Sequence, residues 1–239
     1  MVLSYQKGAN KMLECKNLMK RYMNKTAVED ISLKIESGKI YALLGPNGSG
    51  KTTWMKMAAG LVKPSSGTIL FYGEKIGKNS KKHIAYMSTE PFFYSFMNIA
   101  DVGKYYQDFF EDFDPIKYDN LLNRMELSKK EKAKDLSSGM AAKLKIAVTL
   151  ARRAQLFLLD EPLNGIDIIA RDLIITTILE VVTEKNTVIM SSHLVDELEK
   201  IIHQAIFIKE GKVALSGEVE QIRKEHGKSI VDLYKQIYA

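Results

Sequence analysis

The sequence of 239 residues has one cysteine, one tryptophan and five prolines. The single cysteine, Cys15, excludes a disulfide within the chain and is typical of a reducing compartment. The longest apolar stretch, residues 166–182, is interrupted by charged residues, so it falls short of the roughly 18 clean residues that a membrane span needs. No apolar segment follows basic residues near the start, so we expect no secretory signal, and Met12 is an alternative to Met1 as the translational start. These absences favour a globular protein.

The net charge is +6, and lysine and arginine are dense between Lys129 and Arg153. Such an excess of positive charge has two interpretations. It indicates a surface that binds nucleic acid or an anionic membrane, or a solvated face that also offsets the negative charge of a bound nucleotide. No recognised nucleic-acid motif accompanies the charge. The second interpretation is therefore favoured, and no nucleic-acid partner is expected.

A glycine-rich stretch is the most informative part of the sequence. It consists of Gly45, Pro46, Asn47, Gly48, Ser49, Gly50, Lys51, Thr52 and Thr53. It lies between residues 39–44, which predict a buried strand, and residues 54–59, which predict a helix. Glycines allow successive N–H groups and a helix N-terminus to surround one anion. Lys51 adds a charge for the β- and γ-phosphates, and the Thr52 hydroxyl can bind Mg²⁺. The stretch predicts a nucleotide-binding loop, the alternative being a glycine-rich turn without a ligand.

Two further predicted strands end in polar side chains. Asp160 and Glu161 follow the apolar residues 156–159, and His193 follows residues 187–192. The carboxyl ends of parallel strands share one edge of a sheet, so these side chains are expected near Lys51. Asp160 is then expected to hold Mg²⁺, Glu161 to face the water beyond the γ-phosphate, and His193 to contact that phosphate. A plain turn at residues 160–162 and a structural role for His193 are the alternatives.

Alternating strands and helices predict an α/β fold with a mainly parallel, doubly wound sheet. Strands over 12–15 and 27–35, with a turn at 20–25, predict an antiparallel β portion near the N-terminus. Helices are predicted over 170–183 and 194–202, and a hairpin over 205–215. We expect a single domain over 1–239, with a core at 12–90 and 155–217, a helical insert at 91–154 and a helical tail at 218–239 of unassigned role.

Taken together, the motifs resemble the ATP-binding subunits of ABC transporters, from about Met12 to Gly217. Residues 45–53 resemble the Walker A motif, Asp160 and Glu161 the Walker B aspartate and catalytic glutamate, residues 163–167 the D-loop, and His193 the switch histidine. The resemblance implies the phosphate-loop NTPase fold of ABC ATPases and assigns Lys51, Glu161 and His193 to catalysis. It also implies that Tyr22 stacks on the adenine of ATP and that Val28 contacts the nucleotide.

Two motifs depart from the family pattern. The signature, usually Leu-Ser-Gly-Gly-Gln, is here Leu136, Ser137, Ser138, Gly139 and Met140. Ser137 and Gly139 are kept, and Ser138 retains the backbone N–H needed for an anion at the helix N-terminus. Thr89 stands where the family usually has glutamine, so Thr89, or Glu90 beside it, is a weak candidate for contact with Mg²⁺.

The resemblance implies that two such chains sandwich two ATP molecules, each held by one chain's glycine-rich loop and the other's signature. It implies a membrane subunit as partner, a place at the cytoplasmic face of the membrane and, from residues 110–114 and the signature, an ABC-2-type exporter. The aromatic cluster at Phe92–Phe96 is either a docking site for the membrane subunit or core packing. The competing functions are a regulatory subunit with weakened hydrolysis and a soluble ABC ATPase acting on DNA or ribosomes.

Overall fold

The computed structural model describes residues 11–90 and 93–239. Met1 and Phe92, for which the sequence raised expectations, lie outside the described residues. The strands are β1 (Lys11–Tyr22), β2 (Lys25–Glu36), β3 (Ile40–Leu44), β4 (Ser66–Phe71), β5 (Glu74–Lys75), β6 (Ile84–Met87), β7 (Leu156–Asp160), β8 (Thr187–Ser192), β9 (Gln204–Lys209) and β10 (Lys212–Glu218). The helices are α1 (Lys51–Ala58), α2 (Lys78–Lys81), α3 (Ile99–Phe109), α4 (Pro115–Arg124), α5 (Ser138–Leu150), α6 (Ile168–Val181), α7 (Val195–Leu198), α8 (Val219–His226) and α9 (Ile230–Tyr238), with a short 3₁₀ turn at Ala133–Asp135.

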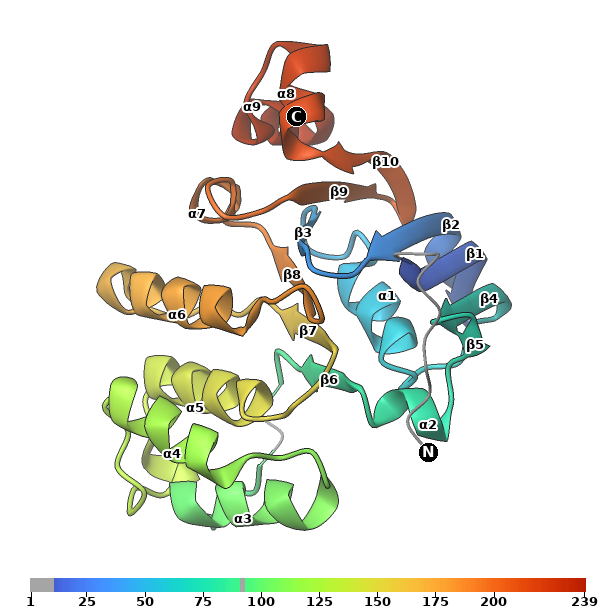
Figure 1. Ribbon diagram of the computed structural model, residues 1–239. Helices are drawn as coiled ribbons and strands as arrows, with labels where there is room; N and C mark the ends of the chain where they lie inside the picture. Colours follow the sequence, from blue (N-terminus) through green and yellow to red (C-terminus); the bar gives the residue numbers. More distant parts are fainter. Residues whose placement is uncertain (1–10, 91–92) are drawn as a thin grey trace.

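The strands form two sheets, as the sequence predicted. The larger has the order β10-β9-β3-β8-β7-β6, in which β9, β3, β8, β7 and β6 pair in parallel and β10 adds an antiparallel edge. The smaller, with the order β2-β1-β4-β5, is antiparallel. This is the mainly parallel α/β fold with an antiparallel β portion, and Figure 1 shows the two sheets on either side of α1.

The parallel sheet separates two hydrophobic cores. Successive residues of a strand point to opposite faces, so Ile40, Ala42 and Leu44 enter the core shared with α3–α9. Tyr41 and Leu43 enter the core shared with α1 and the antiparallel sheet. Every residue of β3 is buried, which explains why its sequence is apolar throughout and does not alternate.

Two local expectations were wrong. The turn predicted at 20–25 is limited to Met23 and Asn24, because β1 stays paired with β2 as far as Tyr22 opposite Lys25. The helix predicted over 194–202 is only α7, Val195–Leu198, followed by turns that lead directly into β9.

Helices α3, α4 and α5 pack against one another in the lower part of Figure 1. Residues 110–114 separate α3 from α4, where Asp114 caps α4 and Pro115 begins it. No helix in the described ranges is both long and apolar enough to span a bilayer.

The predicted helical tail forms α8 and α9, at the top of Figure 1. Ile230 and Leu233 of α9 are buried in the larger core. The Tyr238 hydroxyl shares its proton between the carbonyls of Ile208, at 2.9 Å, and Leu44, at 3.1 Å. The tail therefore packs directly behind the first residue of the glycine-rich loop.

Candidate functional site

A cleft of about 450 Å³ opens at the carboxyl edge of the parallel sheet. It is lined by Tyr22, Lys25, Ala27, Asn47, Gly48, Gly50, Lys51, Thr52, Thr53, Thr89, Glu161 and Asn164. The cleft thus joins the end of β1, the glycine-rich loop, the residues after β6 and the residues after β7. Ligands of open α/β sheets bind at this edge.

The glycine-rich loop leads directly into α1. Gly50 caps the helix with φ at 111°, and no side chain caps its first N–H groups. These N–H groups are therefore available to a ligand, and the N-terminus of a helix favours an anion. A Cβ at Gly50 would lie 2.4 Å from the Ala27 carbonyl oxygen, so the loop has no room for a side chain there.

Lys51 is 5% exposed, and the partners described for its ammonium are oxygen atoms. Its Nζ donates to the carbonyls of Gly45, at 2.6 Å, and Pro46, at 3.1 Å, and lies 3.8 Å from Glu161 Oε1. Burial lowers the pKa of Lys51, while the charges of Glu161 and Asp160 act in the opposite direction. The ammonium is thus held inside the loop, where phosphate oxygens can replace the carbonyls as acceptors.

Asp160 ends β7 as a fully buried carboxylate. The Ser191 hydroxyl donates to its Oδ1 at 2.6 Å, and the Tyr86 hydroxyl donates to its Oδ2 at 3.2 Å. Burial and the charge of Asp160 raise the pKa of Tyr86, so the phenol stays a hydrogen-bond donor. A buried carboxylate needs such partners or a cation.

Glu161 follows in the left-handed conformation, with φ at 50°. Its N–H donates to Ser191 Oγ at 2.9 Å, and its Oε2 lies 3.0 Å from His193 Nδ1. Left-handed backbone costs a non-glycine residue roughly 1–3 kcal/mol, and such strain clusters at functional sites. The structure brings Glu161 and His193 together with Lys51, as the sequence predicted for their positions.

Tyr22 lies at the cleft, 44% exposed, with the Lys20 ammonium 4.9 Å from its ring centre. Val28, the other residue assigned to the nucleotide, is fully buried in the core beneath α1. Because side chains alternate along β2, Ala27 faces the cleft instead. Ala27, and not Val28, therefore lies where the sequence led us to expect a contact with the nucleotide.

The signature begins α5. Ser137 is its N-cap, accepting the Met140 N–H at 3.2 Å. Ser137 and Ser138 are exposed, while Leu136 and Met140 pack against the larger core. Nothing in the lining of the cleft comes from residues 136–140, so the signature and the glycine-rich loop of one chain do not share one cleft.

Sequence reasoning missed several groups around the site. Ser191 joins Asp160 to Glu161, Tyr86 donates to Asp160, and Lys145 donates to the backbone carbonyls of Ser88 and Thr89. Asn164 and Lys25 line the cleft. Serine, tyrosine and lysine are common at many positions, and no spacing in the sequence distinguishes these.

The site suits a nucleotide and Mg²⁺. Ser49 Oγ is buried without a hydrogen-bond partner in the described chain, and an anion at the loop would provide one. Among the described residues no group of three or more His, Cys, Asp or Glu side chains could hold a metal alone. A hydroxyl and one carboxylate, as Thr52 and Asp160 offer, suit Mg²⁺, which keeps waters and phosphate oxygens as its other ligands.

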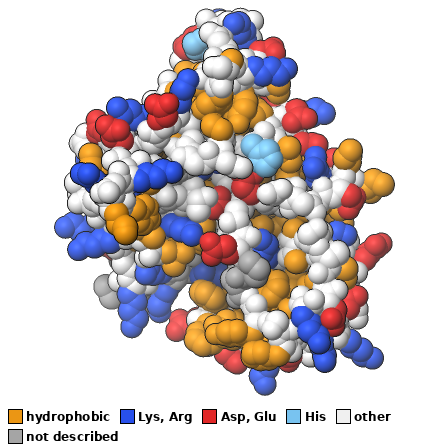
Figure 2. Space-filling model, turned by 180° about the vertical axis from the view of Figure 1, so that it is seen from behind, with side chains coloured by type: hydrophobic (Ala, Val, Ile, Leu, Met, Phe, Trp, Pro, Cys, Tyr) orange, Lys and Arg blue, Asp and Glu red, His pale blue; other side chains and the backbone are white. Residues whose placement is uncertain are grey.

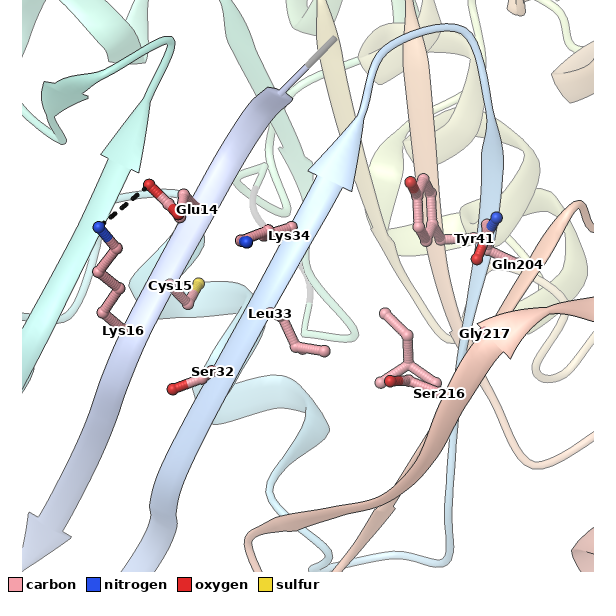
Figure 3. A pocket seen from close by; sticks show the side chains of 11 residues that line it. Glu14, Cys15, Lys16, Ser32, Leu33, Lys34, Tyr41, Gln204, Ser216 and Gly217 are labelled. Carbon is pink, nitrogen blue, oxygen red and sulfur yellow. Dashed lines mark ion pairs between the residues drawn. The ribbon is translucent and has the colours of Figure 1, made fainter. Parts of the chain in front are cut away.

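A second cleft of about 550 Å³ lies at the opposite, amino edge of the parallel sheet (Figure 3). Tyr41, at the start of β3, and Gln204, at the start of β9, line it together with residues of β1, β2 and β10. The Glu14–Lys16 ion pair, at 3.5 Å, lies on its rim. None of the residues predicted to bind nucleotide or metal line this second cleft.

Comparison with known proteins identifies the class. The family model described as ABC transporter matches residues 28–164. The lantibiotic transport ATP-binding protein SrtF of Streptococcus pyogenes is 35% identical over 211 residues, covering 87% of this chain and 92% of that protein. The Nod factor export ATP-binding protein I of Cupriavidus metallidurans is 29% identical over 233 residues, covering 93% of this chain and 77% of that protein.

Solved structures share the fold. An ATP-binding subunit of an ABC transporter superimposes with a TM-score of 0.85 at 24% identity, covering 94% of this chain and 98% of that chain. A dimeric ATP-binding cassette in a post-hydrolysis state with ADP and Pi gives a TM-score of 0.78 at 20% identity, covering 87% of this chain and 98% of that chain. The chain belongs to the ABC transporter family and is one of its ATP-binding subunits, which are ATPases.

Proposed function

We propose that this chain binds and hydrolyses ATP to drive an integral membrane transporter, and that it works as one of a pair of such chains. The observation that carries the proposal is the position of Glu161, which lies between Lys51 and His193 and lines, together with Lys51, the cleft at the glycine-rich loop. Phosphoryl transfer depends mainly on positioning and on stabilising charge, and this group of side chains is arranged for both.

In this proposal Lys51 exchanges the carbonyls of Gly45 and Pro46 for phosphate oxygens when ATP binds. Thr52 and Asp160 would hold Mg²⁺, which when bound adds positive charge at the phosphate oxygens. Asp160 keeps lone pairs for this role because each of its oxygens accepts only one described hydrogen bond. Thr89, at the rim of the cleft, remains a candidate for further contact.

Glu161 is the proposed general base. Its Oε2 contacts His193 and its Oε1 faces Lys51, so the carboxylate is fixed at both oxygens. A carboxylate fixed in this way can orient a water molecule and accept its proton. His193 is then the residue that holds Glu161 in place beside the γ-phosphate.

The signature is proposed to serve the second chain of the pair. Ser137 and Ser138 are exposed at the N-terminus of α5, where an anion is favoured. This end of the helix would contact the γ-phosphate held by the partner's glycine-rich loop. The dimeric cassette with ADP and Pi, which shares the fold, supports such a pairing.

An exposed aromatic cluster is proposed to dock the membrane subunit at the cytoplasmic face of the membrane. Tyr94 stacks on Phe96 with ring centres 5.4 Å apart, and Tyr105 lies 4.5 Å from Phe109. Phe96 and Phe109 are 73% and 67% exposed, whereas Phe93 of the predicted cluster packs against the larger core. Figure 2 shows hydrophobic side chains gathered at the lower end of the molecule, where α3 lies. Similarity to an export ATP-binding protein supports export as the direction of transport.

The regulatory alternative rests on Thr89, Ser138 and Met140, which depart from the family pattern. Hydrolysis by the purified chain alone distinguishes it from our proposal. We expect ATP turnover per chain to rise with protein concentration, since each site needs two chains, and Lys51→Ala to abolish it. Absence of turnover at every concentration, with and without the membrane subunit, would show that this chain is not the catalytic one.

A further inference from the structure

Lys145 connects the helix that carries the signature to the edge of the nucleotide cleft. It lies on α5, and its Nζ donates to the backbone carbonyls of Thr89, at 2.8 Å, and Ser88, at 3.1 Å. Thr89 lines the cleft that holds the glycine-rich loop. One side chain therefore joins the two parts of the site that depart from the family pattern.

The surroundings of Lys145 make this link more than a surface contact. Lys145 is partly buried and forms no ion pair within residues 11–90 and 93–239. Burial lowers the pKa of its ammonium, with the charge of Asp160 acting in the opposite direction. An ammonium removed from water needs good acceptors, and here the acceptors are the carbonyls of the loop that follows β6.

The other end of β6 is held in a similar way. Arg152, just beyond α5, donates from Nη1 to the Ile84 carbonyl at 2.9 Å and from Nη2 to the Lys82 carbonyl at 3.1 Å. Asp112 pairs with the same guanidinium at 3.0 Å. Lys145 and Arg152 thus attach both ends of β6 to the region of α5, so β6 and α5 are expected to move as one unit.

We propose that Lys145 is a positioning residue for ATP hydrolysis, which fixes the backbone at Thr89 and couples it to the signature helix. Threonine has a shorter side chain than the glutamine usual at this position, so its hydroxyl reaches the reacting groups only if the backbone is held close. Lys145 supplies that constraint from α5. The inference rests on the proposed function, because it concerns the same site.

The test compares two lysines of the same helix. Lys143 is also partly buried on α5 and donates to a backbone carbonyl, that of Met125 at 3.4 Å, but it does not reach the cleft. Lys145→Met removes the donor and keeps the length of the side chain, Lys145→Arg keeps a donor, and Lys143→Met is the matched control. The full-length variants are compared for kcat and KM with MgATP, for ATP affinity, and for hydrogen exchange at residues 86–90.

We expect Lys145→Met to lower kcat about tenfold while ATP affinity stays within about twofold. Lys145→Arg should restore kcat to within about threefold, and Lys143→Met should leave it within about twofold. Exchange at residues 86–90 should accelerate in Lys145→Met and stay unchanged in Lys143→Met. Adding Thr89→Gln to Lys145→Met should raise kcat, because the longer side chain needs less support from the backbone.

Equal kcat and equal exchange in Lys145→Met and Lys143→Met would overturn the inference while leaving the ATPase itself intact. If the wild-type chain hydrolyses no ATP, the proposed function fails instead. If Lys145→Met does not fold, Lys145→Arg still tests the inference, because a loss of kcat of about tenfold in a variant that keeps a donor also contradicts it.

Discussion

In and beside the glycine-rich loop, Lys51 is 5% exposed and Asp160 is fully buried, each held by two hydrogen bonds. At the signature, Ser137 and Ser138 are exposed. One side-chain hydrogen bond is described for residues 136–140, and it is the one that Ser137 accepts from the Met140 N–H as N-cap of α5. The first half of the site is therefore assembled within one chain, and the second presents the N-terminus of α5 outward. We expect damage to the glycine-rich loop itself to impair ATP binding by a single chain, and damage to the signature half to impair only the paired chains.

The largest effect is expected from Glu161→Gln. Removing the proposed base should lower ATP turnover about 1,000-fold, within the range typical of general bases, while ATP still binds and the paired state accumulates. Steady-state turnover and size-exclusion chromatography with ATP measure the two parts. Wild-type turnover in this variant would remove Glu161 from the proposed chemistry.

Gly50→Ala tests how tightly the loop half is built. The added Cβ meets the Ala27 carbonyl and φ stands at 111°, so we expect the loop to shift and single-chain ATP affinity to fall about 30-fold, roughly 2 kcal/mol. Gly48→Ala is the control. Gly48 also has a positive φ, of 80°, but nothing lies within 4 Å of the Cβ that the substitution adds. Titration calorimetry with ATP should rank Gly50→Ala well below Gly48→Ala, and similar affinities in both would contradict the close packing of the loop.

Ser137→Ala tests the signature half. It should lower turnover by paired chains about tenfold and leave ATP affinity of the single chain unchanged, although loss of the cap costs about 1 kcal/mol of helix stability. Asn98→Ala removes a comparable cap from α3, in the same helical region but away from the signature. Turnover falling equally in both variants would mean that capping, and not contact with the partner's nucleotide, explains the loss.

The smallest effect concerns proton uptake at Lys51. In the free chain burial lowers its pKa below the usual 10.5, and phosphates favour the charged form, so bound ATP raises the pKa again. As pH rises through the lowered pKa, the neutral lysine must take up a proton before ATP binds, so affinity falls. The γ-phosphate is already ionised above about pH 7.5 and adds no slope there.

We expect a loss of about threefold in single-chain affinity per pH unit in the alkaline range below 10.5, measured by titration calorimetry. Lys51→Met should bind more weakly at every pH, with no such slope. The same slope in Lys51→Met would assign the titration to another group.

The loop half could be predicted from sequence because its chemistry requires particular residue types at fixed spacing. Lys51 must follow the glycines, and Asp160 and Glu161 must end a buried strand. Their supports follow no such rule, since Ser191 and Tyr86 act through hydroxyls that any strand could carry. The contact of Lys145 with the cleft could not be predicted for a different reason, because its acceptors are backbone carbonyls of residues far away in the sequence.

The errors have similar physical causes. Tyr22 lies in β1 and not in the predicted turn, because pairing with Lys25 of β2 extends the strand to that point. Val28 is buried and Ala27 lines the cleft, because neighbouring side chains of β2 point to opposite faces and the sequence does not show which face meets the cleft. Whether residues 91–154 form a separate subdomain stays a prediction.

The scarcity of cysteine has a practical consequence. Cys15 is 2% exposed, and burial raises the pKa of its thiol to about 12, so little reactive thiolate forms at neutral pH. A maleimide dye should therefore react with a cysteine introduced at an exposed site and leave the native thiol untouched. Single fluorophores placed beside Ser138 and beside Asn47 could then report on pairing of the two chains by energy transfer, without first removing any residue of the protein.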